Sequence, residues 1–268
     1  MNTQLKQLCD ELGFEPEATA ALLSASETDE ESVKKFTEGL VSRERFPEST
    51  TELLARYESD KTGWCVLKIM LIAALRSREI YRERGISDEI FLDTMKCFPR
   101  FVREHRASFG TFGFDRGFWV GRQLSLVLFR IGELEYELSE HEGKNAISVH
   151  IPSDADLTPA LLDGSFAAAK DFFARYFPDY ANAHYFCYSW LISPALKNLL
   201  PANSKIILFQ NRFRVLSFDE KADSYKLWVF KNKELSPQDF PENTSLQRRM
   251  KAHVLKGGTV GEALGVLV

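Results

Sequence analysis

Hydrophobic and polar positions alternate with a helical period over residues 1–110, where apolar residues recur every three or four positions. The longest predicted helix covers residues 63–84; its first half is apolar and its last turns are basic, as the helix dipole favours. A second long helix is predicted over residues 88–106, with a bend at Pro99. Thr28 and Glu31 have the spacing of a capping box, which predicts the start of another helix. This part of the chain therefore predicts an all-helical bundle in a supporting role.

Glycine and aromatic residues are interleaved between residues 107 and 121, where the pattern changes abruptly. Such mixing indicates a packed irregular connection rather than a loose linker. We place the domain boundary here and expect a helical domain over residues 1–115 and a second domain over residues 116–268.

Two segments after this boundary alternate apolar and polar residues with the period of a strand, residues 126–138 and 146–152. The link between them is polar and contains Gly143, which predicts a hairpin. Pro152 cannot donate to a β-ladder, so the second strand should end there. In that strand Ser148 and His150 share the face opposite the apolar residues.

The remaining segments complete a mixed pattern of strands and helices, and we expect no strand of the main sheet before about Leu124. The predicted fold class is α+β, an all-helical N-terminal domain followed by a mixed-sheet C-terminal domain. The further predicted elements are a helix over residues 161–176, a strand over 183–192, a short helix over 194–200, strands over 204–218 and 225–231, and a closing helix over 244–256.

Composition narrows the class of protein. A net charge of −4 argues against a general nucleic-acid binder. The most apolar stretch, residues 64–75, is too short to span a bilayer, and no N-terminal run resembles a signal peptide. The 4 cysteines are scattered without metal-binding spacing, so we expect reduced thiols, no metal site and a cytoplasmic location.

Four short runs resemble a bacterial family of acyltransferase-like proteins, which have a helical N-terminal domain and a GNAT-like C-terminal domain. The runs are Arg130-Ile-Gly-Glu-Leu-Glu-Tyr-Glu137, Val149-His-Ile-Pro152, Ser189-Trp-Leu-Ile-Ser-Pro194 and Asn243-Thr-Ser-Leu-Gln-Arg248. The resemblance covers essentially the whole chain and implies the same two-domain fold.

The resemblance also implies where an acyl-CoA would bind. In the GNAT fold two neighbouring strands splay apart, the pantetheine arm inserts between them, and the diphosphate meets backbone N–H groups of the following loop. Here the splayed strands would be residues 147–151 and 185–191, and the loop residues 152–166. The implied acyl-CoA contacts are Ile151, Gly164, Ser165 and Trp190.

The family's loop pattern, Arg/Gln-x-x-Gly-x-Gly/Ala, aligns best with residues 161–166, where only Gly164 matches. Leu161 replaces the basic or amide residue, Phe166 replaces the second small residue, and Asp163 would repel a diphosphate. We expect Phe166 to turn into the core and Gly164 to stay open.

Three residues are implied as catalytic. His150 or Glu135 would be the base, because a neutral imidazole or a carboxylate can take a proton from an amine. Tyr188, or else Tyr185, would protonate the departing thiolate. Each residue also has a purely structural interpretation. His150 could be a hydrogen-bonded histidine beneath a helix, Glu135 could belong to a solvated face of carboxylates, and the tyrosines could be aromatic residues of the core. We expect Trp190 to be largely buried with Phe186 or Leu191.

The sequence therefore predicts an N-acyltransferase that moves an acyl group from acetyl-CoA or another acyl-CoA to a small-molecule or peptide amine by direct attack. The alternative is a non-catalytic GNAT-like ligand-binding or scaffolding protein that has lost the phosphate loop. The altered loop pattern favours the alternative, whereas His150 on a splayed strand favours the enzyme. Neither nucleic acid nor membrane is an expected partner.

Overall fold

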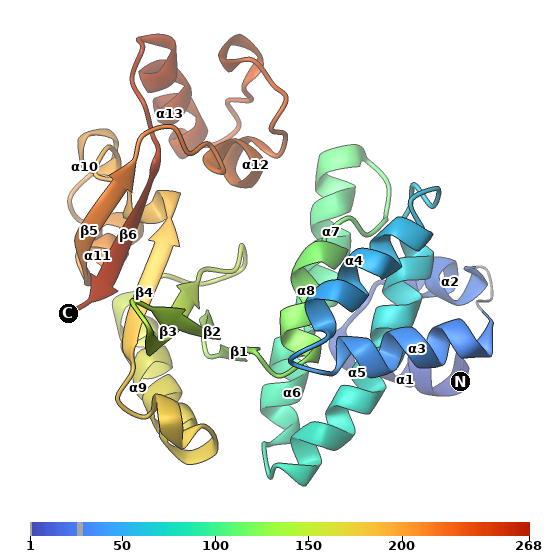
Figure 1. Cartoon of the computed structure of the whole chain (residues 1–268). Helices are drawn as coiled ribbons and strands as arrows, with labels where there is room; N and C mark the ends of the chain where they lie inside the picture. Colours follow the sequence, from blue (N-terminus) through green and yellow to red (C-terminus); the bar gives the residue numbers. More distant parts are fainter. Residues whose placement is uncertain (1, 26–28) are drawn as a thin grey trace. The chain divides into compact units, whose positions relative to one another are not determined.

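The computed structural model describes residues 2–25 and 29–268, and Figure 1 shows their helices and strands. Contacts within the chain divide it into two compact units, residues 1–131 and 132–268. The division falls later than the boundary expected between residues 115 and 116, because residues 117–124 form a helix that packs on two other helices of the first unit. The predicted capping residue Thr28 lies outside the described residues.

The first unit is helical up to its last residues, which form the short strand β1. Helix α5 is at its centre, and α1, α2, α3, α6 and α8 pack against it. The elements are α1 (Asn2–Leu12), α2 (Pro16–Ser24), α3 (Glu30–Leu40), α4 (Phe46–Arg56), α5 (Trp64–Glu83), α6 (Asp88–Met95), α7 (Cys97–Phe109), α8 (Gly117–Leu124) and β1 (Leu128–Ile131).

Local sequence explains where these helices begin and end. Asp29 caps α3 by accepting a hydrogen bond from the backbone N–H of Ser32, and Ser87 caps α6 in the same way. The single helix predicted over residues 88–106 is wrong: α6 ends at Met95 and α7 follows. Pro99 has no N–H to donate to the carbonyl of Met95, four residues earlier, and the helix breaks there.

The sheet is mixed and has the order β1-β2-β3-β4-β6-β5. Strands β2 and β3 pair antiparallel, β3 and β4 parallel, and β6 pairs antiparallel with both β4 and β5. In the described part of the chain no strand precedes Leu128, which confirms the expected helical first part. The strands of the second unit are β2 (Leu134–His141), β3 (Lys144–His150), β4 (His184–Ser189), β5 (Phe213–Asp219) and β6 (Glu262–Leu267).

Helix α9 (Pro159–Tyr176) covers the apolar face of this sheet. The ring of Tyr136 in β2 lies 6.1 Å from that of Phe166 and 6.4 Å from that of Phe173, both on α9. It also lies 5.9 Å from the ring of Tyr185 in β4. The alternation of a strand then places the polar residues of β2 and β3 on the opposite face.

The C-terminal segments differ most from the prediction. The strand predicted over residues 204–218 is wrong in its first part, which is helix α11, capped by Ser204. The strand predicted over residues 225–231 is helix α12, and β6 was not predicted at all. The predicted closing helix is confirmed as α13, with a capping box at Thr244. The remaining elements are η1 (Pro178–Tyr180), η2 (Trp190–Ile192), α10 (Leu196–Leu199), α11 (Lys205–Gln210), α12 (Tyr225–Phe230), η3 (Pro237–Asp239) and α13 (Ser245–Leu255).

Candidate active site

The two parallel strands β3 and β4 separate before either of them ends. Their register runs from Ala146 opposite His184 to Ser148 opposite Phe186, and no later pair joins them among the described residues. Strand β3 continues to His150, whereas β4 continues to Ser189 beside β6, which can be followed in Figure 1. The pairing thus ends before the strands do, as the predicted divergence requires. We call the place where the last residues of both strands are no longer paired with each other the opening.

A cluster of titratable groups lies on the polar face at the β3 side of this opening. Glu135 is directly opposite His150 in the register of β2 and β3, and its side chain is 3% exposed. Residues directly opposite each other share one face of the sheet. The His150 Nε2 atom lies 2.7 Å from Oε2 of Glu137, two residues further along the same face. The predicted bases, His150 and Glu135, are therefore brought together, and Glu137 joins them.

Tyr188 borders the same opening from β4. His150 and Tyr188 each come two residues after the last register pair, Ser148 and Phe186, so they share the polar face. Tyr188 is 54% exposed. Burial, followed by the carboxylates of Glu262 and Asp219, raises the pKa of Tyr188 above its ordinary value.

Two other side chains with possible chemistry on β4, Tyr185 and Cys187, face away from the polar cluster. Tyr185 packs against Tyr136 beneath α9, and burial raises its pKa to about 12. Cys187 is fully buried on the same side, and burial also raises the pKa of its thiol. A buried thiol with a raised pKa is a poor nucleophile. Among Tyr185, Cys187 and Tyr188, only Tyr188 is placed to act at the opening.

The start of α9 differs from the expected phosphate loop. The helix begins at Pro159, with Thr158 as its N-cap, so Gly164 lies in its second turn. Gly164 is thus past the first N–H groups, which a helix leaves without an internal partner, and it lies in the helix rather than in the loop predicted over residues 152–166. Its surface is open, because a side chain added there would meet nothing within 4 Å. The expectation that Gly164 stays open is confirmed.

Two neighbours of Gly164 point into the core. Phe166 packs on Tyr136 and Phe213, as expected. Ser165 was predicted to contact the cofactor, but it is 2% exposed and its hydroxyl lies 2.8 Å from the hydroxyl of Tyr136. This prediction is wrong, because the helical period turns Ser165 towards the sheet.

The loop between β3 and α9 is held through Asp156. Its backbone N–H donates to Glu133 at 2.8 Å, and its carboxylate accepts from Nζ of Lys205 at 2.6 Å. The hydrogen bonds from Lys205 and then from Thr158 lower the pKa of Asp156 to about 2. Ile151, the predicted contact at the start of this loop, is half-buried.

Sequence reasoning missed two cations near the first turns of α9. Besides Lys205 on α11, Arg212 donates to Asp163 and, at 3.0 Å, to the carbonyl of Pro159. The pairing offsets the negative charge of Asp163. Both cations come from about fifty residues further along the chain, and no local pattern marks them.

Trp190 is placed differently from the prediction. It begins the short helix η2, is half-buried, and packs on a separate apolar cluster. Leu191 is buried, but neither Leu191 nor Phe186 belongs to this cluster. The expected burial with Phe186 or Leu191 is therefore wrong. The cluster consists of Tyr225, Val229, Phe230, Phe240, Met250 and Val260.

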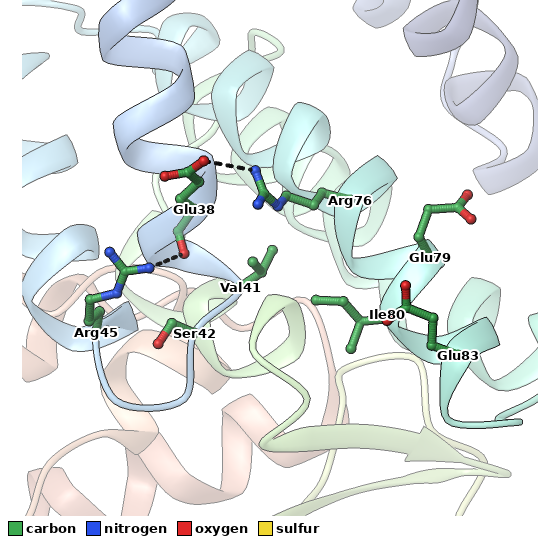
Figure 2. Close-up of a pocket in the computed structure, with 8 residues that line it drawn as sticks. All are labelled: Glu38, Val41, Ser42, Arg45, Arg76, Glu79, Ile80 and Glu83. Carbon is green, nitrogen blue, oxygen red and sulfur yellow. Dashed lines mark hydrogen bonds and ion pairs between the residues drawn. The ribbon is translucent and has the colours of Figure 1, made fainter.

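A surface hollow lies elsewhere, within the helical first unit, and none of the predicted site residues lines it (Figure 2). Arg76 reaches the carboxylate of Glu38 at 3.4 Å across it, and Arg45 donates to the carbonyl of Glu38 at 3.1 Å. Glu79, Ile80 and Glu83 line its other side. Most of its lining residues are charged.

Over the described ranges, no three His, Cys, Asp or Glu side chains come together in a way that could hold a metal ion. No helix there has the length and apolar character needed to cross a membrane.

Comparisons with known proteins agree with the helical first part and the mixed sheet that follows it. Residues 128–267 match the family described as GNAT-like C-terminal domain, and residues 3–126 match the N-acyltransferase N-terminal domain. A search of curated proteins gave no match.

Solved structures of acyltransferases share the fold over nearly the whole chain. One, in complex with decanoyl-CoA and teicoplanin, is 22% identical with a TM-score of 0.83, covering 98% of this chain and 86% of that one. A mutant in complex with octanoyl-CoA is 21% identical with a TM-score of 0.84, covering 99% and 87%. A third, with CoA and 10C-teicoplanin, is 23% identical with a TM-score of 0.83, covering 98% and 86%. At these identities the likeness supports the α+β fold.

Proposed function

The chain belongs to the N-acyltransferase family that joins an N-acyltransferase N-terminal domain to a GNAT-like C-terminal domain, and on this premise we propose that it transfers an acyl group from acyl-CoA to an amine by direct attack. The observation that carries the proposal is the opening between β3 and β4, with His150 and Tyr188 on one face at its two sides. A base and an acid on opposite sides of an acyl-donor site are what the reaction needs.

In the proposed reaction the lone pair of the amine nitrogen attacks the carbonyl carbon of the thioester. As the C–N bond forms, a proton passes from this nitrogen to His150 or to Glu135. The C–S bond then breaks, and the CoA thiolate takes a proton from the hydroxyl of Tyr188. Solvent exchange returns both side chains to their starting protonation. No acyl-enzyme is formed, in keeping with the full burial of Cys187.

The donor would enter along the opening, where backbone groups beyond Ser148 and Phe186 are no longer joined to each other in register. Ile151, the open surface at Gly164 and the exposed part of Trp190 remain candidate contacts, whereas Ser165 is withdrawn. Because the similar solved structures hold octanoyl-CoA or decanoyl-CoA, we extend the proposed donors from acetyl-CoA to these longer acyl-CoAs.

The acceptor is proposed to be a small-molecule or peptide amine. Glu135 and Glu137 put negative charge on the face where the amine would approach, which favours a cationic group. Similar acyltransferases have been solved with teicoplanin or 10C-teicoplanin bound, so teicoplanin belongs in a panel of test amines.

The alternative, a ligand-binding protein without catalysis, is favoured by one observation. The N-terminal turn of α9 already uses the carbonyl of Thr158 for the N–H groups of Leu161 and Leu162, and a proline occupies the first helical position. This leaves fewer backbone donors for a diphosphate than the family pattern provides. In this case acyl-CoA would bind but no CoA would be released.

The test combines calorimetric titration with a thiol-release assay. We expect decanoyl-CoA to bind the wild-type protein, and Gly164→Val to weaken binding roughly tenfold or more by filling the open surface, about 1.4 kcal/mol or more. Ala168→Val, one turn further along α9 and also exposed, is the matched control. Release of CoA with an amine panel (glucosamine, a lysine peptide and teicoplanin) is expected for wild type.

No heat with acetyl-, octanoyl- or decanoyl-CoA at millimolar concentration would reject the acyl-CoA reading. Binding without CoA release would favour the non-catalytic alternative. Equal affinities of wild type and Gly164→Val would show that CoA binds away from the start of α9.

A further inference from the structure

The hydrogen bond between His150 and Glu137 gives the proposed reaction a positioning residue that the sequence did not reveal. Nε2 of His150 lies 2.7 Å from Oε2 of Glu137. We propose that Glu137 fixes the ring of His150 with its proton on Nε2, so that Nδ1 is the atom that accepts the proton from the attacking amine. The inference rests on the proposed function and names the atom through which the base acts.

The register of the hairpin makes this pairing specific. Glu137 lies opposite Ser148, and Glu135 lies opposite His150, so His150 meets Glu137 diagonally across the two strands. Diagonal neighbours on one face are within reach of long side chains. Next to this pair the hydroxyl of Ser148 donates to the hydroxyl of Ser139 at 3.1 Å, which continues the polar row.

Partial burial strengthens the contact between His150 and Glu137. The side chains of His150 and Glu137 are only 25% and 20% exposed, so water screens their interaction less than at an open surface. A hydrogen bond to an ionised acceptor is also stronger than a neutral one. The pair is therefore able to hold the imidazole in one orientation against thermal motion.

The protonation state follows from the chemistry of the two groups. An ionised carboxylate only accepts hydrogen bonds, so the Nε2 atom of His150 must be the donor. A neutral imidazole has one N–H, and its lone pair must then lie on Nδ1. When Nδ1 takes a proton from the amine, the ring becomes cationic and the charge of Glu137 stabilises it. A carboxylate that orients a basic histidine acts in the same way in hydrolase triads.

Glu135 has a different position from Glu137. It lies directly opposite His150 and is almost fully buried, whereas the carboxylate of Glu137 lies within hydrogen-bond distance of Nε2 of the ring. In this arrangement Glu135 adds negative charge beside the imidazole, whereas Glu137 decides which nitrogen carries the proton. Loss of Glu137 should therefore change which nitrogen of the His150 ring carries the proton.

The decisive test is nitrogen NMR of the imidazole rings in the full chain, which contains 5 histidines. The His150 signals are identified by their loss in His150→Gln. For wild type at a pH where this ring is neutral, we expect the proton on Nε2. Glu137→Leu, which lacks the acceptor, should give a mixture of the two tautomers. Glu140→Gln, on the same strand but exposed and remote from the pair, is the control and should match wild type.

Kinetics supply the second readout. Glu137→Gln keeps the size and an acceptor oxygen but loses the charge, so it also serves if Glu137→Leu does not fold. With decanoyl-CoA and the amine panel we expect kcat to fall roughly tenfold to a hundredfold, the size of effect found when the hydrogen-bond partner of a functional imidazole is changed. The fall is expected because the cationic ring formed in the reaction loses the charge that stabilises it. KM for decanoyl-CoA should stay unchanged, because Glu137 is not proposed to touch the donor.

A proton on Nδ1 in wild type, the same tautomer in Glu137→Leu, or an unchanged kcat in Glu137→Gln would each overturn the proposal. A wild-type protein that turns over no acyl-CoA would contradict the proposed function. The ring spectra would still decide whether Glu137 fixes the tautomer, so the two failures are distinguishable.

Discussion

The hydroxyl of Tyr188 can serve as an acid only while it is protonated, and its surroundings extend the pH range in which it is. Burial, then the charges of Glu262 and Asp219, raise its pKa above the ordinary value for tyrosine. Activity that needs the protonated form is therefore present at neutral pH. It is lost as the pH rises through this raised pKa.

We expect Asp219→Asn to move the alkaline limb of the kcat profile to lower pH, because removing a nearby negative charge lowers the pKa of Tyr188. Tyr188→Phe should remove that limb and reduce kcat. Asp171→Asn removes an exposed carboxylate that is not among the groups acting on Tyr188, and it should leave the profile in place. A limb that does not move in Asp219→Asn, or that persists in Tyr188→Phe, would assign the acid to another group.

Trp190 contributes less to stability than its size alone suggests, because it is half-buried at the edge of an apolar cluster. Phe240 is at the centre of this cluster, 1% exposed and stacked 3.9 Å from the ring of Phe230. We expect Phe240→Ala to cost about 3–5 kcal/mol and Trp190→Ala about 2 kcal/mol. Melting curves of the two variants show which one loses more stability. A larger loss of stability for Trp190→Ala than for Phe240→Ala would contradict the peripheral position of Trp190.

At the scale of elements, the sequence predicted those segments in which one period is sustained. Helix α5 and the hairpin of β2 and β3 are long enough for the 3.6- or 2-residue period to be unambiguous. In short apolar runs the period is ambiguous. Residues 205–210 and 225–230 were predicted as strands, but a short, mainly apolar segment fits either element. For residues 205–210 the Ser204 cap was the available signal for a helix. Strand β6 follows the predicted closing helix over residues 244–256, beyond which no further element was predicted.

Pairing between elements explains which parts of the site could be predicted. Alternation within one strand placed His150 and Glu135 on a polar face, and the structure brings them together. The contact between His150 and Glu137 depends on the register between β2 and β3, which alternation alone does not fix. Lys205 and Arg212 reach the region of α9 from distant segments, so their contribution required the fold itself.

On the scale of the whole molecule, three segments far apart in sequence should respond together if acyl-CoA binds at the opening. They are the end of β3, the loop with the start of α9, and the end of β4. Backbone amides that point into the opening have no partner in the β3–β4 register beyond Ser148 and Phe186. A ligand that pairs with such amides lowers their exchange with solvent.

We therefore expect decanoyl-CoA to slow hydrogen exchange in peptides that cover residues 149–151, 152–160 and 187–191. The internal control is the hairpin turn around residues 141–144, at the other end of β2 and β3, whose exchange should not change. A ligand that binds only the native state also stabilises it, so the melting temperature should rise with ligand concentration. If the protein is stabilised while protection appears only outside these three segments, decanoyl-CoA binds elsewhere and the opening between β3 and β4 is not its site. Protection of all three segments without release of CoA would show that the ligand binds at the opening but is not turned over. Catalysis would then be rejected, because binding at the opening is necessary for direct attack but does not supply the proton transfers assigned to His150 and Tyr188.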